Sequence, residues 1–253
     1  MKPSWTLLNA RVDDLALPAL LDHLAAHGGV VHTINLDHYW HLQRDAAFAA
    51  AYRAADVVTC DSHYVQAALR WLGRPLAHRI TGSDLVPALC HDAAQTGRWR
   101  VFLLGARPGV ADRAMAAINA REGQRVVVGA LGPSMRFVQD EAEIDAALAA
   151  ITASGANVLC VGLGAPKQEI WMAHVRDRLP GVRVLMGVGA TIDYESGALR
   201  RAPPSWSRWK MEWLYRVLTE PGRYALRYAR CTAFFRWVLQ ERLGLYRDPF
   251  ANR

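Results

Sequence analysis

Six short apolar runs recur along most of the chain, and each ends at glycine or polar residues. They cover residues 29–35, 56–60, 100–105, 125–131, 157–164 and 183–189. The runs are continuous rather than alternating, which is typical of strands that are covered on both faces of a parallel sheet. Ala-rich stretches with helical spacing, such as DLVPALCHDAAQ and DEAEIDAALAAITAS, lie between them. This alternation predicts an α/β fold with an open, mostly parallel Rossmann-like sheet and helices on both faces.

The pattern changes after Gly197, where no further strand-like run occurs. We predict two helices here, broken at Pro221-Gly222. Residues 198–253 hold twelve basic and four acidic residues, a net charge of +8, so the rest of the chain carries −1 of the total of +7. We therefore expect an α/β core over 1–197 and a basic, aromatic-rich helical membrane-proximal appendage over 198–253. Such charge asymmetry suggests a polyanionic partner.

The basic segment has a helical period of its own. Arg223, Arg227 and Arg230 stand at positions i, i+4 and i+7, beside a stripe that contains Tyr228 and Phe235. Arginine next to aromatic residues is typical of a helix that lies on an anionic membrane. Nucleic acid, or a solvated basic face over packed helices, remains an alternative. Since no run of about 20 uncharged apolar residues occurs, we expect a protein that is soluble or rests on a surface.

Polar side chains stand where several predicted strands end. Thr33 and Asn35 end the first strand, Asp61 follows the second, Gly105 opens a loop before a helix, and Asp193 follows the last. Ligands of open α/β sheets bind at the carboxyl ends of the strands, so these positions are candidates for a binding site. An aspartate after a strand is also typical of a helix N-cap, and that alternative stands for Asp61.

The stretch GLGAPKQEIW, residues 162–171, ends a central strand in the same way. Gly162 and Gly164 allow the backbone to approach a ligand, and Pro166 is suited to the start of a helix. We expect Gln168 and Lys167 to face a nucleotide or sugar. Glu169 either does the same or interacts with the first turn of its helix.

Common motifs for other chemistry are missing. The sequence contains no P-loop, no GxSxG and no DxD pair that would hold a divalent cation against a diphosphate. His38 and His41 are three positions apart, but no carboxylate completes a metal-binding spacing. We therefore expect neither a metal nor a cofactor.

Seven stretches together resemble one known family over about Trp5 to Tyr246. They are TIN, ADVVTCDS, RITGSDLVPAL, FLLGARPGVADRA, VGLGAPKQEIWM, GVGATIDYESGALRRAPPSW and EWLYRVLTEPGRYALRY. In order and spacing the chain is similar to the WecG/TagA/CpsF glycosyltransferases, glycosyltransferase family 26. The resemblance implies an inverting enzyme that moves a hexose from a UDP-sugar to a polyprenyl-diphosphate-linked saccharide, without a metal. It also implies a peripheral location on the cytoplasmic face of the plasma membrane and a role in cell-surface or exopolysaccharide biosynthesis.

The resemblance also implies roles for single residues. Asp61 corresponds to the family's proposed base, and the positions implied to bind substrate are Thr33, Asn35, Arg79, Asp84 and Gln168. A leaving diphosphate needs positive charge, and arginine supplies it in bidentate form where no metal does. We expect Arg79 in this role, together with Arg216, Arg223 and Arg227 from the basic segment.

Several alternatives stay open at this point. A nucleotide-cofactor-dependent oxidoreductase on the same kind of sheet is disfavoured because GxGxxG is missing near the first strand. A non-enzymatic module that docks on membrane or nucleic acid leaves the polar strand ends unexplained. Within the family, the donor sugar can be glucose, N-acetylmannosamine or its uronic acid. The local departures CDS and GPSMRF favour a plain hexose such as glucose in exopolysaccharide assembly. We expect no nucleic acid partner, and a homo-oligomer remains possible.

Overall fold

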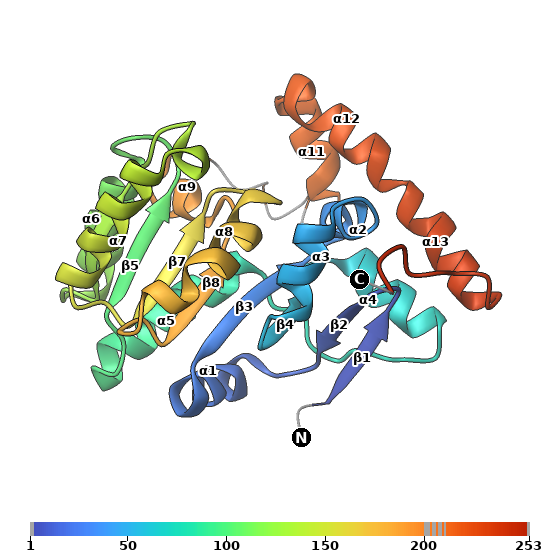
Figure 1. The fold of residues 1–253 in the computed structure, drawn as a ribbon, viewed down its shortest axis with the longest axis horizontal. Coiled ribbons are helices and arrows are strands. Elements are labelled where there is room, and N and C mark those ends of the chain that lie inside the picture. The colour runs from blue at the N-terminus through green and yellow to red at the C-terminus, as the bar shows by residue number, and fades with distance from the viewer. Residues whose placement is uncertain (1–2, 200–202, 204–205, 207–208, 210, 252–253) are drawn as a thin grey trace.

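A computed structural model describes residues 3–199, 203, 206, 209 and 211–251, without the side chains of 212, 216, 223 and 224. All six predicted strands are confirmed, each within one or two residues of its expected ends. They are β3 (Gly29–Ile34), β4 (Val57–Cys60), β5 (Val101–Gly105), β6 (Val127–Leu131), β7 (Val158–Gly162) and β8 (Val184–Gly187). They form one all-parallel sheet with the order β4-β3-β8-β7-β5-β6. The open α/β sheet expected from the apolar runs is therefore the fold of the chain (Figure 1).

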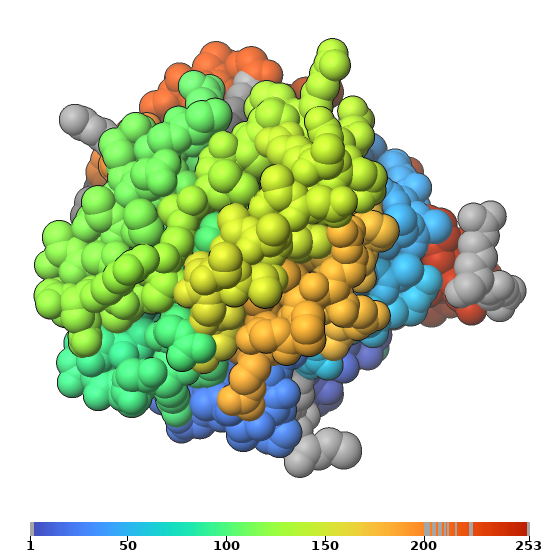
Figure 2. Space-filling model, turned by 60° about the vertical axis from the view of Figure 1, so that its left-hand side comes forward, coloured from blue at the N-terminus to red at the C-terminus, as the bar shows by residue number. Residues whose placement is uncertain are grey.

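Helices cover both faces of this sheet. They are α1 (Leu17–His27), α2 (Leu36–Leu42), α3 (Ala46–Arg53), α4 (His63–Trp71), α5 (Gly82–Thr96), α6 (Val110–Glu122), α7 (Glu141–Ala153), α8 (Lys167–Val175) and α9 (Thr191–Glu195), with short 3-10 turns η1 (Phe137–Gln139) and η2 (Arg176–Arg178). Helices α1, α5, α6 and α9 share one buried cluster with alternate strand residues such as Leu103 and Met186. Other strand residues, such as Phe102 and Leu185, pack with α7 and α8. Figure 2 shows the segments from α7 to η2, yellow-green through orange, forming a continuous surface on this second side. Burial on both faces explains why the strands have no polar alternation.

An N-terminal hairpin was not predicted from the apolar pattern. Strands β1 (Ser4–Leu7) and β2 (Ala10–Asp13) pair antiparallel in a separate two-stranded sheet beside β4. The buried carboxylate of Asp13 ties the hairpin to the main sheet by accepting a 2.8 Å hydrogen bond from the backbone N–H of Val58. These strands have four residues each, and Ser4, Trp5, Thr6 and Arg11 are exposed, so their sequence carries no continuous apolar run.

From Glu212 to Arg242 the basic segment is helical, as predicted, and this part contains one more interruption than expected. Helix α11 spans Glu212–Thr219, α12 spans Pro221–Cys231 and α13 spans Ala233–Arg242. The predicted break is confirmed, since Pro221 opens α12 at its first turn. A second break falls at Thr232. None of the described helices is long and apolar enough to cross a membrane.

Helix α13 belongs to the hydrophobic core. Phe234, Trp237 and Val238 are buried in one cluster with residues of the hairpin and of α2, α3 and α4, such as Leu7 and Tyr39. Figure 1 shows α12 and α13 as a continuous arm that lies against this end of the molecule. The expected division of the chain at 197/198 stays a prediction, but a deletion of 198–253 would uncover part of this core.

Candidate functional site

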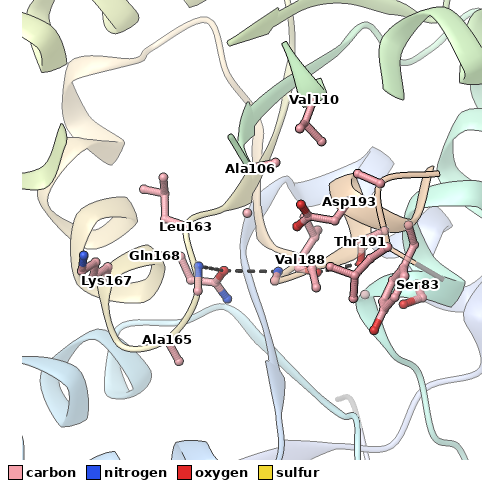
Figure 3. A pocket seen from close by; sticks show the side chains of 18 of the residues that line it. Ser83, Ala106, Val110, Leu163, Ala165, Lys167, Gln168, Val188, Thr191 and Asp193 are labelled. Atoms are coloured by element: carbon pink, nitrogen blue, oxygen red, sulfur yellow. Dashed lines mark hydrogen bonds between the residues drawn. The ribbon is translucent and has the colours of Figure 1, made fainter. Parts of the chain in front are cut away.

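A cavity of about 1360 Å³ lies at the carboxyl ends of the strands. Residues that follow each of the six strands line it, namely Asn35 after β3, Asp61 after β4, Arg107 after β5, Pro133 after β6, Leu163 after β7 and Val188 after β8. Parallel strands place all their carboxyl ends at one edge, which explains why residues distant in sequence meet here. Figure 3 shows a part of this lining, with Lys167 and Gln168 at the start of α8 and Asp193 on α9.

Asp61 and Arg79 face each other at the cavity wall. Asp61 Oδ1 lies 4.0 Å from Arg79 Nη1, and both side chains are just over a quarter exposed. The backbone N–H of Asp61 donates to the carbonyl of Ile34, which continues the β3–β4 pairing and fixes the position of the aspartate. The N-cap interpretation of Asp61 is wrong, because Ser62 caps α4 with a side chain that accepts from the N–H of Tyr64. The carboxylate is therefore not needed to cap the helix.

Three other predicted residues line the cavity and also have local structural roles. Thr33 is buried and donates to the carbonyl of Gly187 on the neighbouring strand. Asn35 is the N-cap of α2, where Oδ1 accepts from two backbone N–H groups, so toward a ligand it offers chiefly the Nδ2 donor. Asp84 forms a capping box with Thr81 at the start of α5. Helix capping alone explains the TGSD stretch, and ligand contact by Asp84 stays a prediction.

Gln168 joins two loops of the cavity wall. Its Oε1 accepts 3.2 Å hydrogen bonds from the backbone N–H groups of Gly164 and Gly189, and the side chain is 2% exposed (Figure 3). Its Nε2 donates to Glu169 Oε1 at 2.7 Å. Lys167, the adjacent residue, leaves the helix in another direction (Figure 3). Gln168 lines the cavity as expected, but its side chain mainly holds the glycine loops after β7 and β8 in place.

Glu169 lies behind the cavity wall in a fully buried position. Its Oε1 is 3.8 Å from Nε2 of His38, which does line the cavity, while Nδ1 of His38 is 2.5 Å from the hydroxyl of Tyr52. Burial raises the pKa of Glu169 to about 7 and lowers that of His38 to about 3. Near neutral pH His38 is therefore neutral, and Glu169 is close to the midpoint of its titration. His38 is a buried residue, not the helix-surface histidine that its spacing to His41 suggests.

Two of the predicted site residues, Gly105 and Glu169, do not line the cavity. The arginines whose side chains are not described, Arg216 and Arg223, are left out of this comparison. Gly105 has a φ of 141°, and a Cβ there would lie 2.5 Å from the carbonyl oxygen of Gly162. It is needed for the close approach of β5 and β7, and contact of Gly105 with a ligand stays a prediction. Gly162, Gly164 and Asp193 do line the cavity.

The basic segment contributes to the cavity through α12. Arg227 lines it, and its Nε lies 2.9 Å from Oδ2 of the buried Asp37. The side chains of Arg216 and Arg223 lie outside the described residues. Among the described side chains of the basic segment, Arg227 is the arginine that lines the cavity with the other predicted residues.

Two basic residues of the cavity were missed by the sequence analysis. Arg107 and Arg113 line it from the loop before α6 and from the first turn of that helix. The available signal was ARPGVADR, a glycine loop at a helix start with an arginine on either side, since such helix starts favour anions. In the part of the chain that the structure describes, no three His, Cys, Asp or Glu side chains are placed to hold a metal ion. Metal-independent chemistry stays a prediction.

The chain matches the model of a known protein family. The model of the glycosyl transferase WecG/TagA/CpsF family covers residues 5–248, nearly the whole chain. This range includes the six strands of the main sheet, the loops that line the cavity and the described C-terminal helices α11, α12 and α13. The match favours a transferase over the oxidoreductase and the non-enzymatic docking module. The chain belongs to the WecG/TagA/CpsF family of glycosyltransferases.

Proposed function

We propose that the protein is an inverting hexosyltransferase that uses a UDP-sugar as donor and a polyprenyl-diphosphate-linked saccharide as acceptor. The observation that carries this proposal is the contact between Asp61 and Arg79, a carboxylate and a guanidinium 4.0 Å apart on the wall of a large cavity. A glycosyl transfer needs a base for the acceptor hydroxyl and positive charge for the departing diphosphate. The two side chains supply one group of each kind.

In the proposed reaction, the acceptor oxygen attacks the anomeric carbon of the donor from the side opposite to the UDP. The new bond from carbon to oxygen forms as the bond from that carbon to the phosphate oxygen breaks, and UDP leaves with both electrons. Asp61 takes the hydroxyl proton. Arg79 and Arg227 stabilise the charge that develops on the diphosphate, since a guanidinium binds phosphate oxygens in a bidentate manner. A single displacement of this kind inverts the anomeric configuration.

The size of the cavity supports a reaction between two large substrates. Ordinary small-molecule sites occupy about 300–1,000 Å³, and this cavity has about 1360 Å³. Among the described residues, four arginines and one lysine line it, namely Arg79, Arg107, Arg113, Lys167 and Arg227. Both proposed substrates are diphosphate esters, so a wide cavity with several cations suits them.

The surface of the C-terminal helices supports a membrane-bound acceptor. Leu226 on α12 is 78% exposed and Leu243, after α13, is 62% exposed, on a segment with a net charge of +8. Exposed apolar side chains beside arginines favour an anionic membrane surface, and each arginine near it contributes about 1 kcal/mol. We infer that the protein is peripheral on the cytoplasmic face of the membrane that holds its acceptor.

The first test is a donor screen with purified protein. UDP release is measured from UDP-glucose, UDP-N-acetylmannosamine and its uronic acid, with a short-chain prenyl-diphosphate sugar as acceptor, with and without a chelator. We expect acceptor-dependent release from one donor, unchanged by chelation, and an inverted anomeric centre by proton NMR. Release that needs a divalent cation, or a product with retained configuration, would refute the mechanism.

The second test replaces the proposed base. Asp61→Asn keeps the shape of the side chain and removes its basicity, so kcat is expected to fall about 10²–10⁴-fold, the usual contribution of a general base. Asp45→Asn is the matched control, because Asp45 caps α3 and asparagine caps a helix equally well. Equal rates for the two variants would exclude Asp61 as the base.

A further inference from the structure

Asp37 is a nearly buried carboxylate that contacts two arginines of the C-terminal segment. Its side chain is 6% exposed, and each of its oxygens has its own partner on α12. Oδ2 lies 2.9 Å from Arg227 Nε, and Oδ1 lies 2.8 Å from Arg230 Nη2. A buried carboxylate is stable only when it is paired and hydrogen-bonded, so these contacts fix α12 against α2.

Asp37 is also connected to the cavity through its own helix, α2. Asn35, which lines the cavity, caps α2 by accepting from the backbone N–H groups of Asp37 and His38. Arg227 lines the cavity from α12. Asp37 therefore connects two cavity residues that are 192 positions apart in the chain, Asn35 and Arg227. Asp37 does not line the cavity itself.

The balance of charge in this contact is suited to anion binding. One carboxylate faces two guanidinium groups, so the cluster keeps a net positive charge although both arginines are held. Burial alone would raise the pKa of Asp37, but Arg227 and Arg230 together hold it below its ordinary value, and the carboxylate is ionised at neutral pH. A one-to-one pair would have neutralised the arginine that it positions.

We propose that Asp37 is a positioning residue for glycosyl transfer, which docks α12 on α2 and holds Arg227 at the cavity without neutralising it. The inference rests on the proposed function for the role of Arg227 toward a diphosphate. The docking of α12 by Asp37 does not depend on which reaction the cavity performs.

A double-mutant cycle tests whether Asp37 acts through Arg227. Asp37→Asn, Arg227→Gln and the double variant are compared for kcat and KM in the UDP-release assay with a soluble acceptor. We expect each single variant to lose about 10- to 100-fold in kcat/KM, the range for a hydrogen bond to a charged group. The double variant should lose no more than the worse single one. Losses that multiply would show that Asp37 does not act through Arg227 and would overturn the proposal.

A second measurement does not require turnover. Hydrogen exchange of residues 221–231 should rise at least about tenfold in Asp37→Asn while the strands stay protected, because α12 loses its anchor. Binding of UDP and of inorganic diphosphate, measured by calorimetry, should weaken about tenfold in Asp37→Asn and Arg227→Gln alike. Unchanged exchange and unchanged binding in Asp37→Asn would overturn the proposal. If the wild-type protein releases no UDP from any donor, the proposed function fails while exchange and diphosphate binding still decide the role of Asp37.

Matched variants control for lost charge and for folding. Asp45→Asn removes one negative charge from the same part of the chain and should leave exchange and kcat/KM unchanged. Arg230→Gln removes one of the two ion pairs of Asp37 and should raise the hydrogen exchange of 221–231 less than Asp37→Asn does. Arg242→Gln removes an arginine of α13 that donates to the carbonyl of Trp71, and it should not affect 221–231. If Arg230→Gln and Arg242→Gln raised the hydrogen exchange of 221–231 equally, the change would come from net charge, and the docking of α12 by Asp37 would be refuted.

Discussion

Glu169 shows how the environment, and not the residue type, decides what a carboxyl group does. Its pKa is raised to about 7 by burial, against an ordinary value of 4.5. Between these values the folded chain holds a proton that the unfolded chain has released. The stability that goes with the protonated form is full below about pH 4.5 and is lost as the pH rises through about 7.

Glu169→Gln should therefore stabilise the protein at high pH and not at low pH. The amide keeps an oxygen that accepts from Gln168 Nε2 and does not ionise. We expect the melting temperatures to be similar near pH 5 and the variant to gain up to the order of 3 kcal/mol near pH 8. The measurement is a series of thermal melts of both proteins from pH 5 to 8. Buried His32 and His38 have lowered pKa values and lose stability as the pH falls, but they do so in both proteins. If the melting temperatures of the two proteins changed with pH in the same way, the raised pKa of Glu169 would be contradicted.

At the residue scale, most of the site residues predicted from the sequence line the cavity, but few of their contacts could be predicted. Asp61 was placed at a strand end by a pattern of six apolar runs, and the structure brings it to Arg79. The pattern could not show that Gln168 bonds to the backbone of a loop 21 positions later. Nor could it show that Gly105 is needed for strand packing, because both facts depend on which strands become neighbours.

Among the elements, those with a long, regular apolar pattern were predicted and those stabilised by distant contacts were not. The six strands are buried on both faces, so each is a continuous apolar run in the sequence. The hairpin of β1 and β2 and the break at Thr232 leave no such mark, since both depend on packing between the two ends of the chain. Leu8 and Glu241, for example, are joined by a 2.7 Å hydrogen bond across 233 positions.

Helix α13 offers a test of this packing with two adjacent residues. Phe234 is fully buried in the cluster that holds Leu7 and Tyr39, while Phe235 is 50% exposed. We expect Phe234→Ala to lower the free energy of unfolding by about 3–5 kcal/mol, since it leaves a cavity in the core. Phe235→Ala should cost much less, because about half of that side chain is already in solvent. Denaturant unfolding of both variants measures the difference. Equal losses would show that α13 does not complete the core.

At the scale of the whole molecule, charge and apolar exposure are concentrated in one segment. The net charge of +8 over 198–253 accompanies exposed apolar residues on or next to the C-terminal helices, namely Leu218, Leu226, Phe235, Leu239, Leu243 and Leu245. The same segment brings Arg227 to the cavity. Because one segment carries both features, binding to a membrane would present the cavity to a lipid-linked acceptor at the surface where that acceptor lies.

This arrangement predicts membrane binding with two separable components. Vesicles that contain anionic phospholipid should bind the protein, while neutral phosphatidylcholine vesicles bind it at least about tenfold more weakly, because several arginines each contribute about 1 kcal/mol. Raising the salt from 0.1 to 0.5 M should reduce the first binding through screening. The double variant Leu226→Asn/Leu243→Asn should weaken binding to both kinds of vesicle about 10- to 100-fold and leave turnover on a soluble acceptor unchanged, since the two leucines are exposed and do not line the cavity. Sedimentation with vesicles measures the binding for each vesicle type, salt concentration and variant. Binding that ignores both salt and the two leucines would locate the membrane contact elsewhere on the molecule, and the segment would then serve the cavity alone.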